Sequence, residues 1–493
     1  MIRRLIILLL IVGCGTEPEE IVGCIDSLAC NFDEEANNFD DNCIYPENNY
    51  DCLGNKLDEC GIPNGNGYNQ YGCCDLTQPD ELGICDGYLD KVSYFPNENA
   101  QLFLHSILSD SSLEIPIATI DGIEMGFIIA NVFPQKIENI NVWGNGYGYI
   151  VSSVFTIPNL PSGLYLIADK IPFIIKSSSN VDALVVYPSN TINAYNRSGG
   201  ASFYTDPKAN VLSFLRPQSN YYHSSFSIPF FKWISSLNYN FSYIADIDLD
   251  DENIFNTSKL IIIPGHNEYW SRKARKNFDE FISAENDAII LSGNTMWWQI
   301  RYEKNHQIVC YKSIILDPIN DPFLKTTNWY KSILEYPILN SIGVDFRYGG
   351  YGDQEDQGWD GFKIINPLSP LFDGIEIELN QIISVPTSEY DGTPISAIQN
   401  GNPIIDNDLL NFHKIEIIGY DIGIKWGTTN ENSYPLFLIF QKTPTSGYVI
   451  NTSSTDWCYK GFLGQDSDII KQITINAIDL LLMNKNIFSE DLP

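Results

Sequence analysis

The chain has 493 residues, well above the size at which one hydrophobic core stops growing, so we expect two to four domains. Hydrophobic residues make up 44% of the chain and charged residues 18%, which excludes a disordered or collagen-like protein. The formal net charge is −33, from 62 acidic and 29 basic residues. This excess excludes a general nucleic-acid binder, because phosphate binding requires clustered Lys and Arg.

The negative charge is unevenly distributed along the chain. Residues 15–90 contain 18 acidic residues and a single base, Lys56, a net charge of −17. Residues 91–493 contain 44 acidic and 26 basic residues, a net charge of −18 over a much longer stretch. About half of the acidic excess therefore belongs to the N-terminal segment.

Residues 1–14 predict an export signal. Arg3 and Arg4 precede an apolar run that is too short for a permanent transmembrane helix. The run ends at Gly13 and Cys14 and resembles the lipobox of bacterial lipoproteins, in which the cysteine is lipidated. We expect an exported bacterial lipoprotein, at the outer membrane or cell surface, held in the lipid membrane through Cys14. A plain secretory signal is the alternative.

Residues 15–90 form a predicted Cys- and Asp-rich tether module with few large apolar residues. Its eight cysteines after Cys14 are Cys24, Cys30, Cys43, Cys52, Cys60, Cys73, Cys74 and Cys85. In an exported chain, this density predicts a framework of up to four disulfides. Zinc is disfavoured because paired CxxC units are missing.

Six acidic residues interleave with the first cysteines of this module: Asp26, Asp33, Glu34, Glu35, Asp40 and Asp41. Their hard carboxylate oxygens suit Ca²⁺, and a solvated acidic face is the alternative. The stretch from Gly23 to Cys43 resembles short Cys- and Asp-rich repeats in surface proteins of marine and gliding bacteria. The resemblance implies a spacer or adhesion module without catalysis.

Two further domains follow. Residues 91–178 contain short β-branched or aromatic runs separated by turn residues, which predict a β-sandwich domain. In residues 179–493, short apolar strands alternate with longer amphipathic runs. This alternation predicts an α/β domain with a parallel sheet flanked by helices.

Polar residues gather after three of these predicted strands. Tyr195 follows strand 183–187, His266 and Glu268 follow strand 259–263, and Asn294 follows strand 288–292. Because parallel strands end at one edge of a sheet, these loops predict an active site. Each residue also has a purely structural interpretation. Tyr195 could pack in the core, His266 could be an ordinary loop histidine, Glu268 could be favoured by the start of a helix, and Asn294 could be a turn residue.

Four motifs in this region resemble a known family. They are Tyr187-Pro-x-Asn-Thr-x-x-Ala-Tyr-Asn-x-x-Gly-Gly-x-Ser-x-Tyr204, Pro264-Gly-His-Asn-Glu-Tyr-Trp-Ser271, Ser292-Gly-Asn-Thr-x-x-Trp298 and Ser454-Thr-Asp-Trp457. Together they resemble the large (beta) subunit of N,N-dimethylformamidase, in its C-terminal domain, from about residue 150 to the end. The resemblance implies a fold like that of class I glutamine amidotransferases.

The resemblance also implies an iron-dependent amidohydrolase. In this family a mononuclear Fe³⁺ ion is held by two tyrosines and one glutamate, which match Tyr195 and Glu268 here. The second tyrosine is matched to Tyr165, with Tyr187 or Tyr204 as alternatives. Three anionic oxygen ligands favour a trivalent, oxygen-loving metal and leave coordination positions open.

Three further residues match catalytic positions of the family. His266 and Asn294 match residues that orient the substrate or lie behind the ligands, and Glu389 matches a carboxylate that pairs with the histidine. The implied reaction is hydrolysis of an amide C–N bond to a carboxylic acid and an amine, with His266 moving a proton and Asn294 donating to the oxyanion. The implied substrate is a small amide or an amide on a surface glycan.

The sequence admits one alternative function and excludes another. A non-catalytic lipoprotein that binds a cell-surface glycan or peptide with the same fold is the alternative to the enzyme. A glutamine amidotransferase is excluded because its nucleophilic cysteine is missing where Ser292-Gly-Asn-Thr295 stands. The pairing of Cys310 and Cys458 is left open by the sequence.

Overall fold

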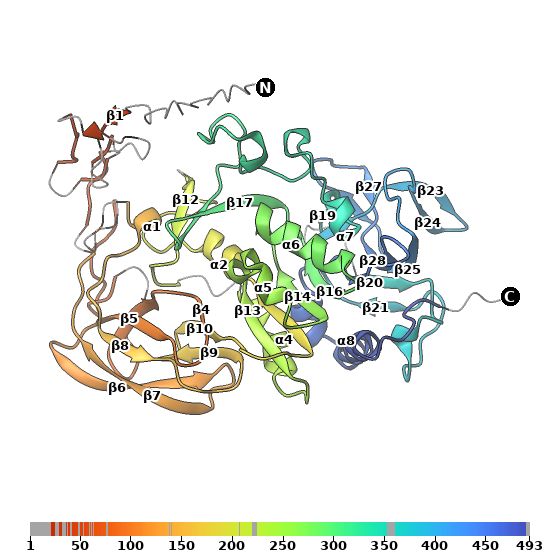
Figure 1. Ribbon diagram of the computed structural model, residues 1–493, viewed down its shortest axis with the longest axis horizontal. Coiled ribbons are helices and arrows are strands. Elements are labelled where there is room, and N and C mark those ends of the chain that lie inside the picture. Colours follow the sequence, from red (N-terminus) through yellow and green to blue (C-terminus); the bar gives the residue numbers. More distant parts are fainter. Residues whose placement is uncertain are drawn as a thin grey trace, which may run out of the picture.

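The computed structural model describes residues 21–489, except 25–28, 32–35, 37, 40–41, 48–49, 53, 59, 61, 63, 75–76, 138, 140, 207, 219–223 and 353–359 (Figure 1). The predicted signal peptide, the lipidation site Cys14 and the tether residues 15–20 lie outside this range. The six acidic residues considered for Ca²⁺, namely Asp26, Asp33, Glu34, Glu35, Asp40 and Asp41, also lie outside the described residues. Within the described part, no helix combines the length and the apolar character needed to cross a membrane.

The N-terminal module is held together by disulfides, as predicted. The four bridges are Cys24–Cys43, Cys30–Cys52, Cys60–Cys74 and Cys73–Cys85. Its regular structure in the described residues is one short parallel pair, β1 (Val22–Gly23) with β2 (Asn38–Phe39). Cys310 and Cys458, whose pairing the sequence left open, are buried free thiols.

Polar side chains shape the turns between the bridges. Carboxylate Oδ1 of Asp58 accepts from the backbone N–H groups two and four residues ahead, at 2.8 and 2.9 Å. Oδ1 of Asn69 does the same at 2.9 and 3.2 Å, and Oδ1 of Asp80 at 2.9 Å for both. These side chains therefore satisfy backbone donors in a segment that has little regular structure.

A β-sandwich follows the module. Its smaller sheet has the order β3 (Ile84–Leu89), β5 (Asn99–Ser106), β8 (Ser153–Thr156). Its larger sheet has the order β4 (Ser93–Tyr94), β10 (Ile171–Ile175), β9 (Gly163–Ile167), β6 (Ser111–Thr119), β7 (Glu124–Val132), and α1 (Val142–Asn145) lies between β7 and β8 along the chain. Alternating residues such as Leu102, Leu104, Ile117 and Phe173 point between the two sheets and form their shared core.

A nine-stranded mixed sheet forms the centre of the larger domain (Figure 1). Five neighbouring strands are parallel: β13 (Phe241–Ala245), β11 (Ala183–Tyr187), β14 (Leu260–His266), β16 (Asp287–Gly293) and β29 (Tyr448–Asn451). Four more continue the sheet in antiparallel fashion: β28 (Leu436–Gln441), β25 (Lys414–Tyr420), β20 (Gly361–Ile364) and β21 (Ile382–Ser384).

The predicted parallel sheet flanked by helices, like that of class I glutamine amidotransferases, is therefore wrong as a description of this fold. The structure is rich in strand, with 34% strand and 18% helix, and most connections contain no long helix. An apolar strand buried on both faces has the same sequence pattern in either direction. Direction is decided by the connections, and the short link from β28 to β29 permits only an antiparallel pair.

Few helices cover this sheet. On one face, α6 (Arg272–Ser283) packs Phe278 and Ile282 against the strands, and its N-cap Ser271 accepts a bond from the N–H of Ala274 at 2.9 Å. The short helices α5 (Glu252–Phe255) and α7 (Leu339–Ile342) lie on the same side. The other face is covered by α4 (Ile228–Ile234) and α8 (Ser467–Leu482).

Smaller sheets extend from the strand ends of this domain. One has the order β12 (Val211–Ser213), β18 (Gln307–Val309), β17 (Trp298–Glu303), β15 (Tyr269–Ser271). Another has the order β22 (Glu389–Gly392), β19 (Asp345–Tyr351), β26 (Gly423–Lys425), β27 (Asn432–Ser433), and β23 (Ile395–Gln399) pairs with β24 (Asn402–Ile405). Because β15 and β17 directly follow β14 and β16, they lie at the carboxyl edge of the central sheet.

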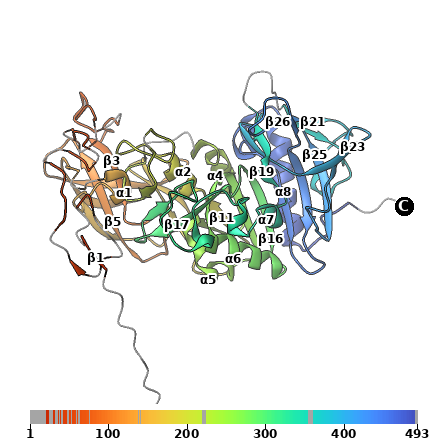
Figure 2. The ribbon, with the colours of Figure 1, turned by 90° about the horizontal axis from the view of Figure 1, so that it is seen from above.

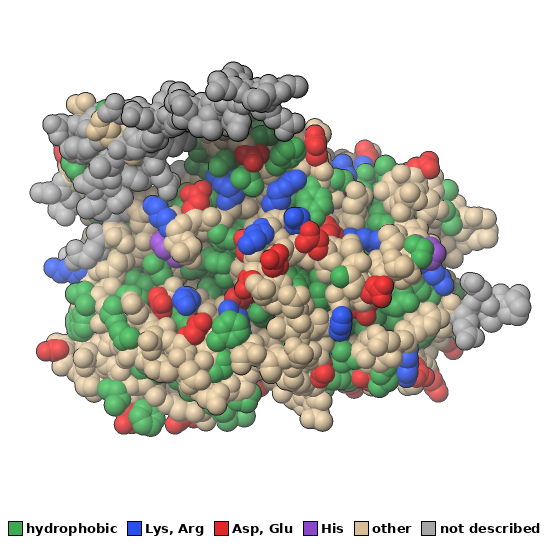
Figure 3. Space-filling view, viewed as in Figure 1, with side chains coloured by type: hydrophobic (Ala, Val, Ile, Leu, Met, Phe, Trp, Pro, Cys, Tyr) green, Lys and Arg blue, Asp and Glu red, His purple; other side chains and the backbone are tan. Residues whose placement is uncertain are grey.

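The module and the sandwich lie at one end of an elongated molecule, and the mixed sheet continues beyond them (Figure 2). Polar contacts join the sandwich to the larger domain. Asp248 binds Lys176 Nζ at 2.6 Å and Ser93 Oγ at 2.9 Å, and the N–H of Tyr243 donates to Ser162 Oγ at 2.8 Å. On the face drawn in Figure 3, acidic and basic side chains are interspersed, so this face carries no single-sign field.

Candidate functional site

The residues that the sequence placed at strand ends come together at the carboxyl edge of the parallel strands. Tyr195 is the last residue of α2 (Ser189–Tyr195), which follows β11. His266 ends β14, Glu268 follows it, and Asn294 follows β16. Glu389, far away in the sequence, enters this group as the first residue of β22.

Glu268 lies at the centre of the group and is 2% exposed. The hydroxyl of Tyr195 donates to Oε2 of Glu268 at 3.0 Å. The hydroxyl of Tyr204 lies 2.8 Å from Oε1 and 3.1 Å from Oε2 of the same carboxylate, and 2.6 Å from the hydroxyl of Tyr269. The rings of Tyr195 and Tyr204 are stacked with centroids 4.0 Å apart. One carboxylate and two phenol oxygens thus meet within hydrogen-bond distance.

Burial determines the protonation of this group. It raises the pKa of Glu268, and the nearby His266 and Lys312 oppose that rise. It also raises the pKa values of Tyr195 and Tyr204 well above 10, and the negative charge of Glu268 raises them further. Both phenols therefore stay protonated, and each donates a hydrogen bond to the carboxylate.

His266 lies between two carboxylates and is 1% exposed. Its Nε2 is 3.5 Å from Oε2 of Glu268 and 3.4 Å from Oε2 of Glu389. Burial lowers the pKa of His266, although the charges of Glu268 and Asp456 act in the opposite direction. The imidazole is therefore neutral near pH 7 and can accept a proton.

Asn294 connects the end of β16 to Glu389. Its side-chain Nδ2 donates to Oε2 of Glu389 at 2.8 Å. The backbones of Glu389 and Thr455 approach the end of β16 so closely that residue 293 must be glycine. A Cβ at that position would lie 2.6 Å from the N atom of Thr455 and 2.7 Å from the carbonyl O of Glu389. Asn294 itself has φ +48°, a left-handed conformation that Asn tolerates better than most residues.

The loop after β29 holds Glu389 in place. The N–H of Glu389 donates to Oγ1 of Thr455 at 3.1 Å, and the N–H and hydroxyl of Thr455 donate to the carbonyl of Glu389 at 3.1 and 2.9 Å. Asp456 accepts from the N–H of Ser388 at 2.6 Å. The late motif Ser454-Thr-Asp-Trp457 therefore supports the carboxylate that faces His266.

Comparison with known proteins agrees with this geometry. Residues 151–461, more than half of the chain, match the family described as N,N-dimethylformamidase beta subunit-like, C-terminal. The chain belongs to this family. No curated protein matches the chain. The matched range contains each residue of the group around Glu268.

The N,N-dimethylformamidase-like assignment left the second tyrosine open among three residues, and the structure separates them. Tyr165 lies in β9 of the sandwich core, where its hydroxyl donates to the carbonyl of Pro161 at 2.8 Å. Tyr187 packs against Phe231 with ring centroids 5.7 Å apart. The structure brings neither to Glu268, and it places Tyr204 there instead. The local sequence around Tyr165 was too short to distinguish it from Tyr204.

Lys312, which the sequence did not single out, also belongs to the site. Its Nζ lies 3.5 Å from the ring centroid of Tyr204 and 4.8 Å from that of Trp298. Burial lowers the pKa of Lys312 to about 8, and the negative charge of Glu268 opposes this shift. No motif surrounds Lys312, and only its position two residues after the buried Cys310 could have suggested it.

The oxygen atoms that converge at the site fit the ferric ion that the resemblance implies. The described residues contain no group of three or more His, Cys, Asp and Glu side chains arranged for a metal ion. Tyr195, Tyr204 and Glu268 form a different set, with two phenols and one carboxylate whose oxygens converge. Loss of the two phenol protons would give three anionic oxygens, which matches the charge and hardness of a ferric ion.

Proposed function

We propose that this protein is an iron-dependent amidohydrolase that cleaves an amide C–N bond to give a carboxylic acid and an amine. The observation that carries the proposal is the meeting of Tyr195, Tyr204 and Glu268 beside a neutral, buried His266. Membership of the N,N-dimethylformamidase beta subunit-like family supports the same class of reaction.

Tyr195, Tyr204 and Glu268 would hold a single ferric ion. When bound, the ion would supply Lewis-acid chemistry, which polarises the amide carbonyl and acidifies a water molecule. The surrounding apolar wall, which includes Trp298 and the ring of Tyr269, excludes bulk water and strengthens the electrostatic interactions at the site.

The chain's own residues move the proton. Neutral His266 takes a proton from the attacking water and passes it to the departing amine nitrogen, which returns the imidazole to its neutral form. Glu389 stabilises the positive charge that His266 acquires, from 3.4 Å away. One N–H of Asn294 orients Glu389, and its second amide N–H would donate to the negative charge that develops on the carbonyl oxygen.

We also propose that the enzyme is held at the outer membrane or cell surface of a bacterium through a lipid on Cys14. The sequence of residues 1–14 and the disulfide-linked module support export, because disulfides form in oxidising compartments. Replacing Cys14 by serine should abolish incorporation of a labelled fatty acid and release the protein from the membrane fraction. Continued labelling of Cys14→Ser would contradict the anchor.

Iron content and visible absorption of the purified protein test the enzymatic proposal. The wild-type protein should contain about one iron per chain and show a tyrosinate-to-iron charge-transfer band, both lost in Glu268→Ala. The matched control is Glu416→Gln, since Glu416 also has a pKa raised by burial but binds Ser489 and Asn366 elsewhere. A panel of amides is then scored for amine release. A folded wild-type protein that takes up no ferric iron would refute the proposal.

A further inference from the structure

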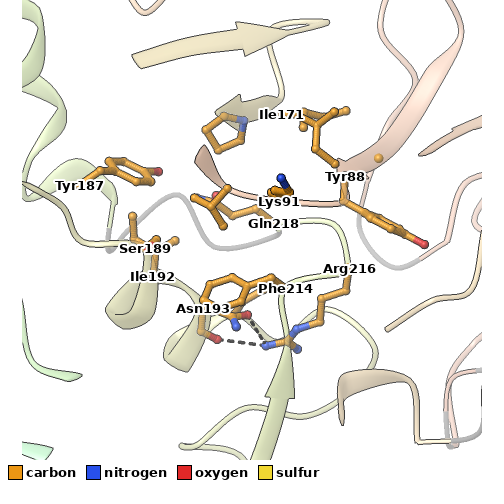
Figure 4. Close-up of a pocket in the computed structure, with 15 residues that line it drawn as sticks. Tyr88, Lys91, Ile171, Tyr187, Ser189, Ile192, Asn193, Phe214, Arg216 and Gln218 are labelled. Atoms are coloured by element: carbon orange, nitrogen blue, oxygen red, sulfur yellow. Dashed lines mark hydrogen bonds between the residues drawn. The ribbon is translucent and has the colours of Figure 1, made fainter. Parts of the chain in front are cut away.

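A buried arginine lies behind the chain segment that carries both tyrosines. Arg216 follows β12 and is 3% exposed. Figure 4 shows its guanidinium group directed at Asn193 of α2, beside a small cavity between the sandwich and α2. Its Nη2 donates to the carbonyl O and to Oδ1 of Asn193, both at 3.0 Å.

The other three N–H groups of Arg216 bind backbone carbonyls. Nη1 donates to the carbonyl of Ser198 at 2.7 Å and to that of Ala201 at 3.0 Å, and Nε donates to that of Ser213 at 3.0 Å. The guanidinium group therefore uses all five of its donors on protein oxygens. Four of the five bonds reach the segment 193–201.

The positions of these acceptors matter because they bracket the two tyrosines. Tyr195 lies between Asn193 and Ser198 along the chain, and Tyr204 comes three residues after Ala201. Between the end of α2 and the start of β12 the described residues, 196–206 and 208–210, form no regular helix or strand, and Gly199 and Gly200 have φ of +80° and +92°. The hydrogen bonds of Arg216 thus replace the secondary structure that would otherwise fix this segment.

We propose that Arg216 is the positioning residue that fixes Tyr195 and Tyr204 relative to each other, and thereby sets the affinity of the site for ferric iron. The inference rests on the proposed function, since it concerns the same ligands. Lysine cannot replace Arg216, because an ammonium group has three donors and lacks the planar fork that reaches carbonyls on opposite sides.

The test compares two buried arginines. Arg275 in α6 is 0% exposed and binds the carbonyls of Tyr336 and Pro337, each at 2.7 Å, away from Glu268. Arg216→Lys should weaken ferric iron binding at least about tenfold, which corresponds to ~1.4 kcal/mol of binding free energy. It should also shift the charge-transfer band. Arg275→Lys should keep the affinity and the band of the wild-type protein, although both variants lose buried hydrogen bonds.

Hydrogen exchange of the metal-free proteins gives a readout that does not depend on iron. Arg216→Lys should accelerate exchange in 194–204, where the N–H of Phe203 binds the carbonyl of Ala194. Arg275→Lys should accelerate exchange around 334–342 instead. If Arg216→Lys does not fold, Asn193→Ala removes one of the five bonds and should give the same changes at smaller size.

The outcomes separate the inference from the proposed function. Unchanged iron affinity and an unchanged band in Arg216→Lys would overturn the inference, as would unchanged exchange in 194–204. A wild-type protein that takes up no iron would refute the proposed function and the link to iron affinity. In that case the exchange data alone would decide whether Arg216 fixes the two tyrosines.

Discussion

At the scale of single residues, the site depends on charges that are buried next to proton donors. A buried carboxylate is costly unless its oxygens receive hydrogen bonds, and Glu268 receives them from Tyr195 and Tyr204. Lys312 places a cation against the ring of Tyr204, which adds positive potential at the same point. The positive charge of Lys312 therefore favours the ionised form of Glu268 and opposes the rise in its pKa.

Replacing His266 by glutamine should reduce the turnover number without loss of iron. In the proposed mechanism the neutral imidazole exchanges a proton with the substrate, and loss of a general acid-base residue typically costs about 10²–10⁴-fold in rate. The measurement is kcat and KM for a cleaved amide, together with iron content. Near-normal kcat in His266→Gln would show that another group moves the proton.

The raised pKa of Asp246 should make the stability of the folded protein depend on pH. Burial raises its pKa to about 8 in the folded protein, and its Oδ2 accepts from the N–H of Asn190 at 2.7 Å. Between its ordinary pKa near 4 and about 8, the folded state binds one more proton than the unfolded state, so stability falls as pH rises. Each pH unit in this window costs up to about 1.4 kcal/mol of unfolding free energy.

Denaturant unfolding of Asp246→Asn at pH 5 and pH 7 measures this contribution. The wild-type protein should lose more stability than the variant between the two pH values, because the asparagine does not titrate. An equal loss in both proteins would show that Asp246 is ionised in the folded state throughout this range.

At the scale of elements, the ends of β14, β16 and β29 determine where the catalytic groups meet. Parallel pairing sets His266 of β14 opposite Gly293 of β16, so the residues that follow emerge side by side. The loop after β29 then binds both main-chain groups of Glu389. β22 and the loop after β29 are thereby joined where Glu389 faces the imidazole of His266.

Replacing Thr455 by valine removes the hydroxyl that binds Glu389 and should lower kcat roughly tenfold, equal to about 1.4 kcal/mol. Iron content should not change, because the hydroxyl of Thr455 binds the main chain of Glu389 and the carboxylate of Asp456 and not an iron ligand. Thr393→Val is the matched control: Thr393 is 2% exposed and its hydroxyl donates to the carbonyl of Gly343 at 3.1 Å. Equal loss of kcat in both variants would mean that the effect is general destabilisation.

At the scale of the whole molecule, stability is divided between a disulfide-linked module and two domains with hydrophobic cores. The module buries few large apolar residues, and its described core cluster contains Cys60, Ile62 and Cys74. The central sheet, by contrast, is covered on both faces by extensive clusters. Loss of the disulfides should therefore affect the module and leave the site intact.

Reduction of the native protein tests this division. Each bridge closes a loop of 12 to 22 residues, and loops of this length contribute about 3 kcal/mol apiece. After reduction and removal of the reductant, limited proteolysis should cut within residues 24–85, whereas iron content and amide cleavage persist. Cys310 and Cys458 are free thiols, so reduction does not alter them. Loss of iron from the protein with an opened module would show that the module supports the site.

Part of the candidate site could be predicted from sequence. His266, Glu268 and Asn294 lie at or just after the ends of apolar strands, and Tyr195 ends the helix that follows one, so parallel strands bring them to one edge without further information. The cysteine density alone determined that the module would be disulfide-linked. Both inferences rest on local signals, which do not depend on how distant segments pack.

Only the tertiary structure decided the rest. Strand direction in 361–441 depends on connections and pairing, which the apolar pattern does not encode, so the sheet is mixed and not parallel. Tyr204, which the sequence offered only as an alternative to Tyr165, lies at Glu268. Lys312 joins the site and Arg216 binds the segment behind it, although no motif contains either residue. Local sequence determined which residue types follow each strand, whereas long-range packing determined which of them meet.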